Sequence, residues 1–210
     1  MLIAGPIFFL LAAFALALAP SLSSVDSALK NLAGQAILLQ ADVGFAILSD
    51  LLVIPAALAL YFALKGVNRN AMLVASGFLG LFAVLDLSVS IPNLPPMIAL
   101  SQNYLSATTS AQQVADTASM SNLFSTLSLV LPICAFLIPS IGSLTASLVL
   151  LRGIFGRLVA YVGLAASAAG IAVALGLVLP ALTYVNLVYL PLFGAWFVLV
   201  GSKLYRLARQ

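Results

Sequence analysis

The sequence predicts an all-α integral membrane protein with six transmembrane helices and with both termini in the cytoplasm. Hydrophobic residues make up 64% of the 210 residues and charged residues only 6%, too little polar surface to enclose a water-soluble core. The apolar residues also form runs of the roughly 20 residues that a helix needs to cross the hydrocarbon core. A third observation, the placement of the basic residues, sets the orientation. We therefore expect residues 1–210 to form a single helical bundle.

Six apolar runs are the predicted spans. The first, 2–20, has no Lys or Arg at its start, which favours a retained helix over a cleaved signal peptide. The fourth is too long for a straight crossing, and Pro132 and Pro139 within it predict a kink or a break. The other five spans are predicted at 43–64, 71–91, 123–151, 158–182 and 184–202.

The basic residues are divided unequally between the two sides of this arrangement. Only Lys30 falls on the side of the first connection. By the positive-inside tendency the opposite side is cytoplasmic, so we expect a multi-pass protein of the cell membrane with the lipid bilayer as its first partner. The seven residues on that cytoplasmic side are Lys65, Arg69, Arg152, Arg157, Lys203, Arg206 and Arg209.

Two longer connections are predicted on the outer side. Residues 21–42 place apolar side chains at helical spacing behind Ser and Asp capping candidates, which predicts a short interfacial helix leading into the second span. Residues 97–122 are rich in Ser, Thr, Gln and Ala, and we expect a surface helix near 111–119. This second connection is either a solvated linker or a lid or docking surface.

Two carboxylates fall inside predicted spans. Asp50 and Asp86 lie about seven and five residues from the outer ends of the second and third spans, roughly 8 to 11 Å below the outer surface. Ser49 is beside the first carboxylate and Ser90 is one helical turn from the second. No Lys or Arg in any span can neutralise them.

These four side chains are the candidate site. Two acids brought together in an apolar setting would hold a proton or recruit a cation, so Asp50, Asp86, Ser49 and Ser90 are a hypothetical ion or proton site. The alternative is structural: each Asp is hydrated near the interface or bonded to Ser, Tyr104 or Gln102, and only orients its helix.

Composition argues against several other functions. The chain has no His, no Glu and a single cysteine, Cys134, so the usual zinc, haem and di-iron ligand sets are missing, and no disulfide can form within the chain. We expect no metal, cofactor or nucleic acid partner, and no catalytic residues, because an enzyme would have to work with Asp, Ser and Tyr alone. The run "AASAAG", 165–170, predicts a small-residue packing seam.

The order of several motifs resembles a known family. "ALYFALK" closes the second span, "LSQNYLSA" lies in the outer connection, and "LLRGIFGRLVAYVGLAA" joins the fourth and fifth spans, before a basic tail. This order is similar to that of domain-of-unknown-function family 4386, a group of uncharacterised prokaryotic membrane proteins. The resemblance implies a six-span architecture and no particular catalytic residues.

Two hypotheses for function follow. The favoured one is a non-catalytic accessory or scaffold subunit of a larger membrane complex, because short loops and few reactive side chains leave most of the surface for packing against lipid and other membrane subunits. The alternative is a small secondary transporter or ion-coupled permease that uses Asp50 and Asp86.

Overall fold

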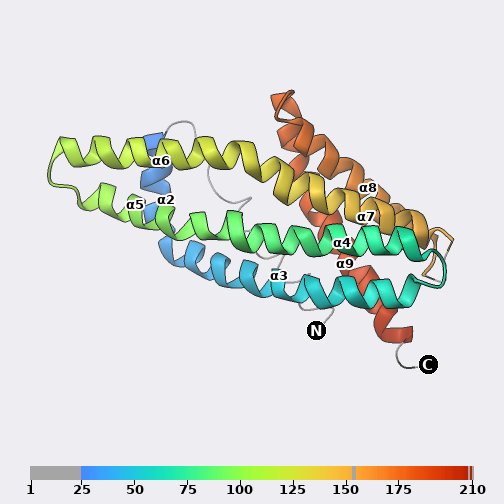
Figure 1. Cartoon of the computed structure of the whole chain (residues 1–210). Coiled ribbons are helices and arrows are strands. Elements are labelled where there is room, and N and C mark those ends of the chain that lie inside the picture. Colours follow the sequence, from blue (N-terminus) through green and yellow to red (C-terminus); the bar gives the residue numbers. More distant parts are fainter. Residues whose placement is uncertain (1–24, 153–154, 208, 210) are drawn as a thin grey trace.

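The computed structural model describes residues 25–152, 155–207 and 209, and the predicted first span, 2–20, lies outside them. The described residues form helices and turns and contain no strand. Long helices run side by side, and a hairpin extends from one end of the bundle (Figure 1). The α-helices are α2 Val25–Gly34, α3 Ala36–Leu64, α4 Arg69–Leu85, α5 Leu94–Ser106, α6 Ser110–Leu131, α7 Ile138–Leu150, α8 Arg157–Leu175 and α9 Asn186–Leu207.

Five helical segments of the described chain are long and apolar enough to cross a membrane, as expected of a multi-pass membrane protein. Two of these segments are compound, because α4 continues into α5 and α6 continues into α7 without a loop. The five segments are Ala36–Leu64, Arg69–Ser106, Ser110–Leu150, Arg157–Leu175 and Pro180–Leu207.

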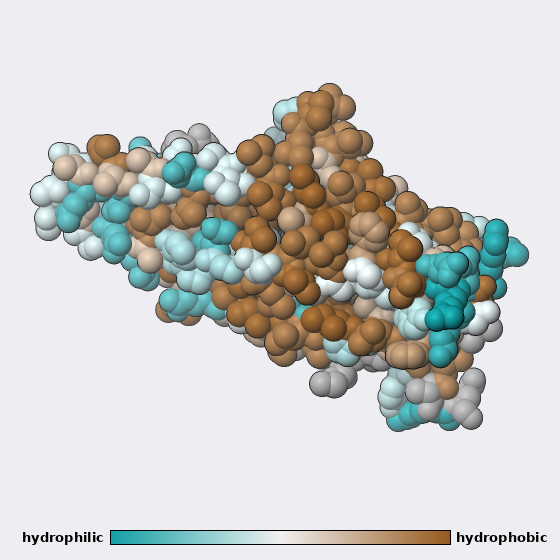
Figure 2. Space-filling model, viewed as in Figure 1, coloured by the Kyte–Doolittle hydropathy of each residue, from teal (hydrophilic) through white to brown (hydrophobic). Residues whose placement is uncertain are grey.

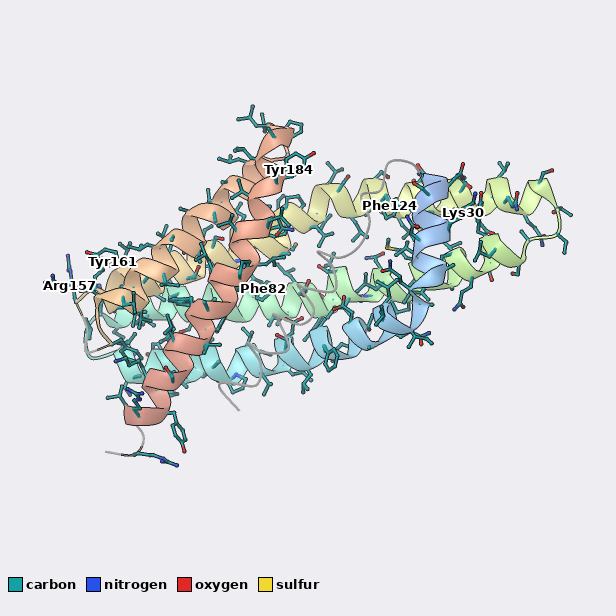
Figure 3. The ribbon with its side chains drawn as sticks, turned by 180° about the vertical axis from the view of Figure 1, so that it is seen from behind. Lys30, Phe82, Phe124, Arg157, Tyr161 and Tyr184 are labelled. Atoms are coloured by element: carbon teal, nitrogen blue, oxygen red, sulfur yellow. The ribbon has the colours of Figure 1, made fainter. Side chains whose placement is uncertain are left out.

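Neighbouring helices pack in the order α3, α4, α7, α8 and α9, and α9 crosses the face of the bundle (Figures 1 and 3). The approach of α4 to α7 is close at Gly142, where an added Cβ would lie 3.0 Å from Leu79 Cγ and 3.1 Å from the Ala75 carbonyl oxygen. Small residues allow such backbone contact between membrane helices. The main apolar core lies among these five helices and includes Leu79, Trp196 and Phe193.

The compound segments contain short π-helices where their two halves join. The first, η1, is Asp86–Ser90, followed by the 3₁₀ turn η2, Ile91–Asn93, and the second, η3, is Pro132–Leu137. A break was predicted near Pro132, and the structure has a π-turn there. Proline has no backbone N–H to donate, so the regular α-helical hydrogen bonding is interrupted at this residue.

The outer connection predicted over 97–122 is helical almost throughout. Helices α5 and α6 form an antiparallel hairpin with a three-residue turn, 107–109, and the predicted surface helix near 111–119 is only part of α6. The Thr109 side chain caps α6 by accepting a hydrogen bond from the Gln112 N–H at 3.3 Å. Met97 and Met120 pack between the two helices, giving this polar sequence a core of its own.

Helix α2 is the expected short helix, and it lies across this hairpin (Figure 3). Its Leu29 is fully buried against the hairpin. The Asp26 carboxylate accepts hydrogen bonds from the Tyr104 hydroxyl at 3.5 Å and from the Thr117 hydroxyl at 3.3 Å. One short helix thus joins both legs of the hairpin.

Several predicted span boundaries differ from the helices. Helix α3 begins at residue 36 instead of 43, so the predicted span omitted its first two turns, which contain Gln40 and Asp42. The predicted fifth span, 158–182, ends as a helix at Leu175, and a 3₁₀ turn, η4 Pro180–Val185, precedes α9. A proline at the start of that turn cannot continue the hydrogen bonding of α8. Hydropathy locates the apolar run, whereas capping and proline decide where the helix ends.

The surface is layered in polarity. On the face shown in Figure 2, a broad apolar band covers the middle of the bundle, the hairpin end is mostly polar, and a strongly hydrophilic cluster lies at the other end. Lys30 and Arg157 are at opposite ends (Figure 3). The α3–α4 turn, with Lys65, lies at the same end as Arg157 (Figure 1). We call the end with Lys65 and Arg157 the arginine end, and the opposite end the hairpin end.

Candidate functional site

The two predicted carboxylates meet in the structure. Asp50 lies on α3 and is 2% exposed, and Asp86 is the first residue of η1. The two side chains lie close enough for the Asp86 carboxyl group to interact with that of Asp50. The contact arises because α3 packs along α4, which brings two residues of similar depth onto facing sides. We call these two residues the carboxyl pair.

The polar atoms around the pair are poorly satisfied. Asp50 Oδ2 is buried and accepts no hydrogen bond, and Ser90 Oγ, in the same π-helix as Asp86, is buried without a partner. Ser90 therefore bonds to neither carboxyl group, contrary to a shared four-residue site. Ser49 is 3% exposed beside Asp50. A further carboxylate oxygen, Asp42 Oδ1, is buried and unpaired nearer the outer end of α3.

The structural alternative for the carboxylates named hydration, Ser, Tyr104 and Gln102, and the last two lie at other places in the structure. The Tyr104 hydroxyl donates to Asp26. Gln102 lines a pocket of about 210 Å³ between α3 and α5 at the hairpin end. The other polar side chain of that pocket is Gln40, and its apolar residues are Val43, Pro95, Ile98 and Ala99.

An apolar cluster lies next to the pair toward the arginine end. Val53 follows Asp50 by three residues and Phe82 precedes Asp86 by four, so each is about one turn away on the same helix. Both are buried, together with Ala83. Asp50 is therefore enclosed on this side by apolar groups, whereas Asp86 is partly exposed.

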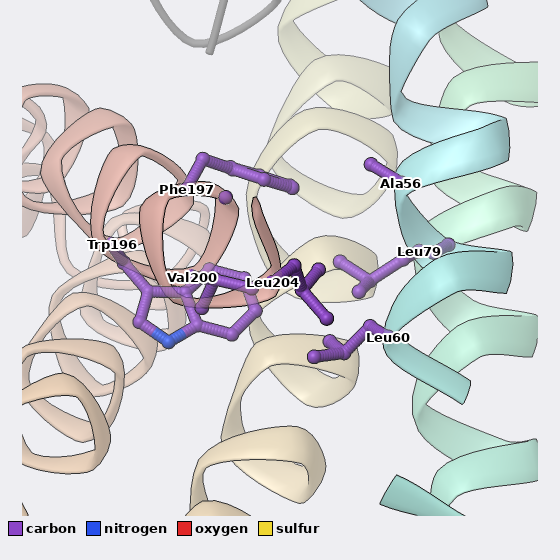
Figure 4. A pocket seen from close by; sticks show the side chains of 9 residues that line it. Ala56, Leu60, Leu79, Trp196, Phe197, Val200 and Leu204 are labelled. Atoms are coloured by element: carbon purple, nitrogen blue, oxygen red, sulfur yellow. The ribbon is translucent and has the colours of Figure 1, made fainter. Parts of the chain in front are cut away.

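The pocket beyond this cluster cannot hold a substrate. It lies between α3, α4 and α9, has a volume of about 10 Å³, which is enough for about one water molecule, and is lined by apolar side chains such as Leu60, Leu79 and Val200 (Figure 4). The larger pocket at the hairpin end is therefore the better candidate for solute entry.

A group of buried hydroxyls on α7 and α8 was not selected from the sequence. Ser140, Ser143 and Ser147 on α7 and Ser167 on α8 are each 0% exposed. The Oγ atoms of Ser143 and Ser167 are 2.8 Å apart and hydrogen-bonded. We call these four residues the hydroxyl column. The spacing of three and four residues on α7 was the available signal, because it places all three serines on one helix face.

Aromatic residues of α9 complete this region. A Cβ on Gly163 would overlap Ser147 Oγ and Trp196 Nε1, and a Cβ on Gly170 would overlap Ser140 Oγ and the Tyr189 ring. Helices α7, α8 and α9 therefore meet at two levels, and the predicted seam at 165–170 is indeed a site of close packing. Tyr189 stacks on Phe193 with ring centroids 5.1 Å apart. Four polar atoms at these two levels lack a well-formed hydrogen bond: Ser140 Oγ, Ser147 Oγ, Tyr189 Oη and Trp196 Nε1.

The Tyr189 ring borders the hydroxyl column, because it lies beside Ser140 Oγ at the level of Gly170. In the part of the chain that the structure describes, no three His, Cys, Asp or Glu side chains gather closely enough to hold a metal ion. The chemistry that the two carboxyl groups offer is proton or cation binding.

Comparison with protein-family models, with curated proteins and with solved structures gave no match. The resemblance to domain-of-unknown-function family 4386 accordingly stays a prediction.

Proposed function

We propose that the protein is a small secondary transporter or ion-coupled permease whose coupling ion binds at Asp50 and Asp86. The observation that carries the proposal is the contact between a buried carboxyl group and a second carboxyl group inside a membrane-spanning bundle. Ionisable residues in membrane spans are costly, and where they face the bundle interior they mark ion pathways and proton relays.

A structural role explains this arrangement less well. An Asp that only orients a helix near the interface would be hydrated or paired with a donor. Asp50 instead is almost inaccessible, has one oxygen without a donor, and contacts another acid. Binding of a proton or cation would remove the repulsion between the two groups, so the site gains stability when it is loaded.

The surrounding elements supply the other parts that a transporter needs. The pocket of about 210 Å³ at the hairpin end offers two amide side chains for solute binding on the outer side of the pair. The π-helix that begins at Asp86 lies within a spanning segment, and such turns recur at functional sites. The apolar cluster at Phe82 separates the pair from the arginine end along α3 and α4.

Replacement of either carboxyl group should abolish coupled transport. We expect Asp50→Asn and Asp86→Asn to reduce proton- or sodium-driven flux at least tenfold, because an amide releases no proton and has no negative charge to balance a cation. The measurement uses purified protein in vesicles filled with a small-molecule extract of the source cells, which supplies the unknown solute, under an imposed proton or sodium gradient.

Asp116→Asn is the matched control, because Asp116 lies on α6 in the outer hairpin, away from the apolar band. This variant should transport like the wild type. Each protein must elute as a single peak in detergent before its flux is compared. If both pair variants keep wild-type flux, the carboxyl mechanism is wrong.

The accessory or scaffold role is the second candidate, and one observation favours it. The outer hairpin with α2 forms a separate apolar cluster and a polar surface outside the apolar band, where a partner could dock. Purification from native membranes together with larger subunits would support this role, and a free protein with Asp-dependent flux would argue against it.

The remaining features of the topology are also proposals. We infer that 2–20 is a sixth span, that both termini are cytoplasmic, and that the protein resides in the cell membrane. The gathering of Lys65, Arg69 and the other basic residues at the arginine end supports this orientation. The low number of basic residues gives no support to a nucleic acid partner.

A further inference from the structure

We infer that the arginine end binds the phosphate groups of anionic phospholipids, and that Arg69 and Arg152 lie at the centre of the binding surface. This inference goes beyond the proposed function and does not depend on the carboxyl pair. It gives a role to basic side chains that the proposed transport mechanism does not use.

Four basic residues lie on elements that pack side by side at this end. Helix α4 begins at Arg69, and its antiparallel neighbour α7 ends two residues before Arg152. Lys65 is in the turn that joins α3 to α4, and Arg157 begins α8, which packs against α7. All four residues are exposed. We call Lys65, Arg69, Arg152 and Arg157 the basic face.

Buried apolar residues hold the backbone beneath the basic face in place. Leu64, Leu150 and Phe155 are each no more than 1% exposed and belong to the main apolar core. Each of them lies one or two residues from a member of the basic face. Because these anchors pack in one core, the four positive charges stay gathered at one end of the bundle.

No acidic side chain of the chain lies near this charge. Asp50 is 15 residues from Lys65 along α3, and Asp86 is 17 residues from Arg69 along α4. These separations correspond to about 22 Å and 25 Å along the helix axes, more than twice the Debye length of about 8 Å at physiological salt. The other three Asp residues are closer to the hairpin end. The charge of the basic face is therefore left for an external anion.

Exposed aromatic side chains indicate that this anion belongs to a lipid. Phe62, Tyr161 and Tyr205, on α3, α8 and α9, are 61%, 58% and 48% exposed. Phe62 precedes Lys65 by three residues and Tyr161 follows Arg157 by four, so each lies about one turn closer to the middle of the bundle (Figure 3). Aromatic residues, tyrosine in particular, favour the membrane–water interface. The basic face accordingly lies at the level of the lipid headgroups.

The chemistry of the basic face suits a phosphodiester. A guanidinium group can donate two parallel N–H hydrogen bonds to the oxygens of one phosphate group. Seven of the eight basic residues of the chain belong to this end, and clusters of roughly four to eight Lys and Arg beside a membrane span attract anionic lipids. A zwitterionic lipid also has a phosphate, but its own ammonium group balances that charge, so the basic face should prefer an anionic lipid.

The test compares two lipids that differ in headgroup charge. Delipidated full-length protein in detergent is titrated with a phosphatidylglycerol and with a phosphatidylcholine that has the same acyl chains, and native mass spectrometry counts the bound lipids. Arg69→Gln with Arg152→Gln removes the two central charges and keeps long polar side chains. Lys30→Gln is the matched control, because Lys30 is exposed at the hairpin end. Inorganic phosphate is added as a competitor in a third titration.

We expect the wild type to bind phosphatidylglycerol at least tenfold more tightly than phosphatidylcholine. Loss of each arginine should weaken phosphatidylglycerol binding about fivefold, so the double variant should lose about tenfold or more, whereas Lys30→Gln should bind like the wild type. Equal affinity for the two lipids, or unchanged binding in the double variant, would overturn the inference. Displacement of phosphatidylglycerol by inorganic phosphate at equal concentration would also overturn it, because a soluble anion would then be the ligand.

If the double variant does not fold, Lys65→Gln with Arg157→Gln removes the other two charges of the basic face and is judged by the same titrations. Asp50→Asn should bind phosphatidylglycerol like the wild type. A negative lipid titration and a negative transport test are therefore separate results, and each contradicts only its own proposal.

Discussion

Gly163 allows close contact between α7, α8 and α9 at one of their two meeting levels. A Cβ at this position would overlap both Ser147 Oγ and Trp196 Nε1, and the Trp196 side chain is fully buried. Since the indole ring cannot move into a well-packed core without displacing other groups, even one methyl group has to be accommodated by a backbone shift.

We predict that Gly163→Ala lowers the free energy of unfolding by about 1 to 3 kcal/mol, the usual cost of overpacking a core. Gly77→Ala on α4 is the control, because a Cβ there meets nothing within 4 Å. Alanine is the better helix former, so this control should be neutral or slightly stabilised. Thermal unfolding in detergent compares the two, and equal midpoints would contradict the packing described for α8.

The carboxyl pair shows how far single residues can be predicted from sequence. The depths of Asp50 and Asp86 followed from counting residues along two apolar runs. Their contact did not, because helix rotation is set by packing against neighbours. Ser90 was expected within the site because it lies one α-helical turn from Asp86, but it is in a π-helix, which changes that spacing.

Helix α2 holds the outer hairpin together. Leu29 is its only large side chain that is fully buried, and Asp26 bonds to both legs of the hairpin. A helix of ten residues is marginal in isolation, so its stability depends on these tertiary contacts.

We predict that Leu29→Ala releases α2 from the hairpin. Truncation of a buried Leu costs about 2 to 5 kcal/mol, so the α2 amides should lose at least tenfold in protection against hydrogen exchange. Lys30→Ala, at the exposed neighbouring position, should leave the exchange rates unchanged. If the α2 amides stay fully protected against hydrogen exchange in Leu29→Ala, the polar contacts of Asp26 alone are enough to hold α2 on the hairpin.

At the level of elements, the apolar runs and the short helix α2 were predictable, whereas the pairing of α5 and α6 into a hairpin was not. The spans that contain α3, α7 and α9 were located by hydropathy alone, because lipid requires long uninterrupted apolar stretches. The hairpin was missed because Ser, Thr and Gln are common in loops. Its apolar Met97 and Met120 make contact only across two helices, which no local pattern reveals.

The whole molecule has a polarity axis with basic residues at one end and the hairpin at the other. If the positive-inside tendency holds, the arginine end faces the cytoplasm. The structure has the uneven distribution of basic residues between its two ends that this prediction requires. Which end faces the cytoplasm is decided when the cell inserts the protein into the membrane.

We predict that a membrane-impermeant maleimide labels Thr108→Cys in intact cells and labels Gly66→Cys only after lysis. Thr108 is exposed in the hairpin turn and Gly66 is exposed in the α3–α4 turn, so either thiol reacts wherever the reagent can reach it. The variants are made in Cys134→Ser, which leaves a single thiol. The reverse pattern of labelling would invert the proposed topology.

The hairpin and the carboxyl pair are mechanically connected. Both legs of the hairpin continue into the bundle through a π-turn, and Asp86 begins one of these turns while Cys134 lies in the other. A rigid hairpin that is pulled sideways therefore bends the chain next to the acids and changes the separation of Asp50 and Asp86. If the carboxyl pair is the proposed ion site, an antibody bound to the tip of the hairpin should alter ion binding without touching the site.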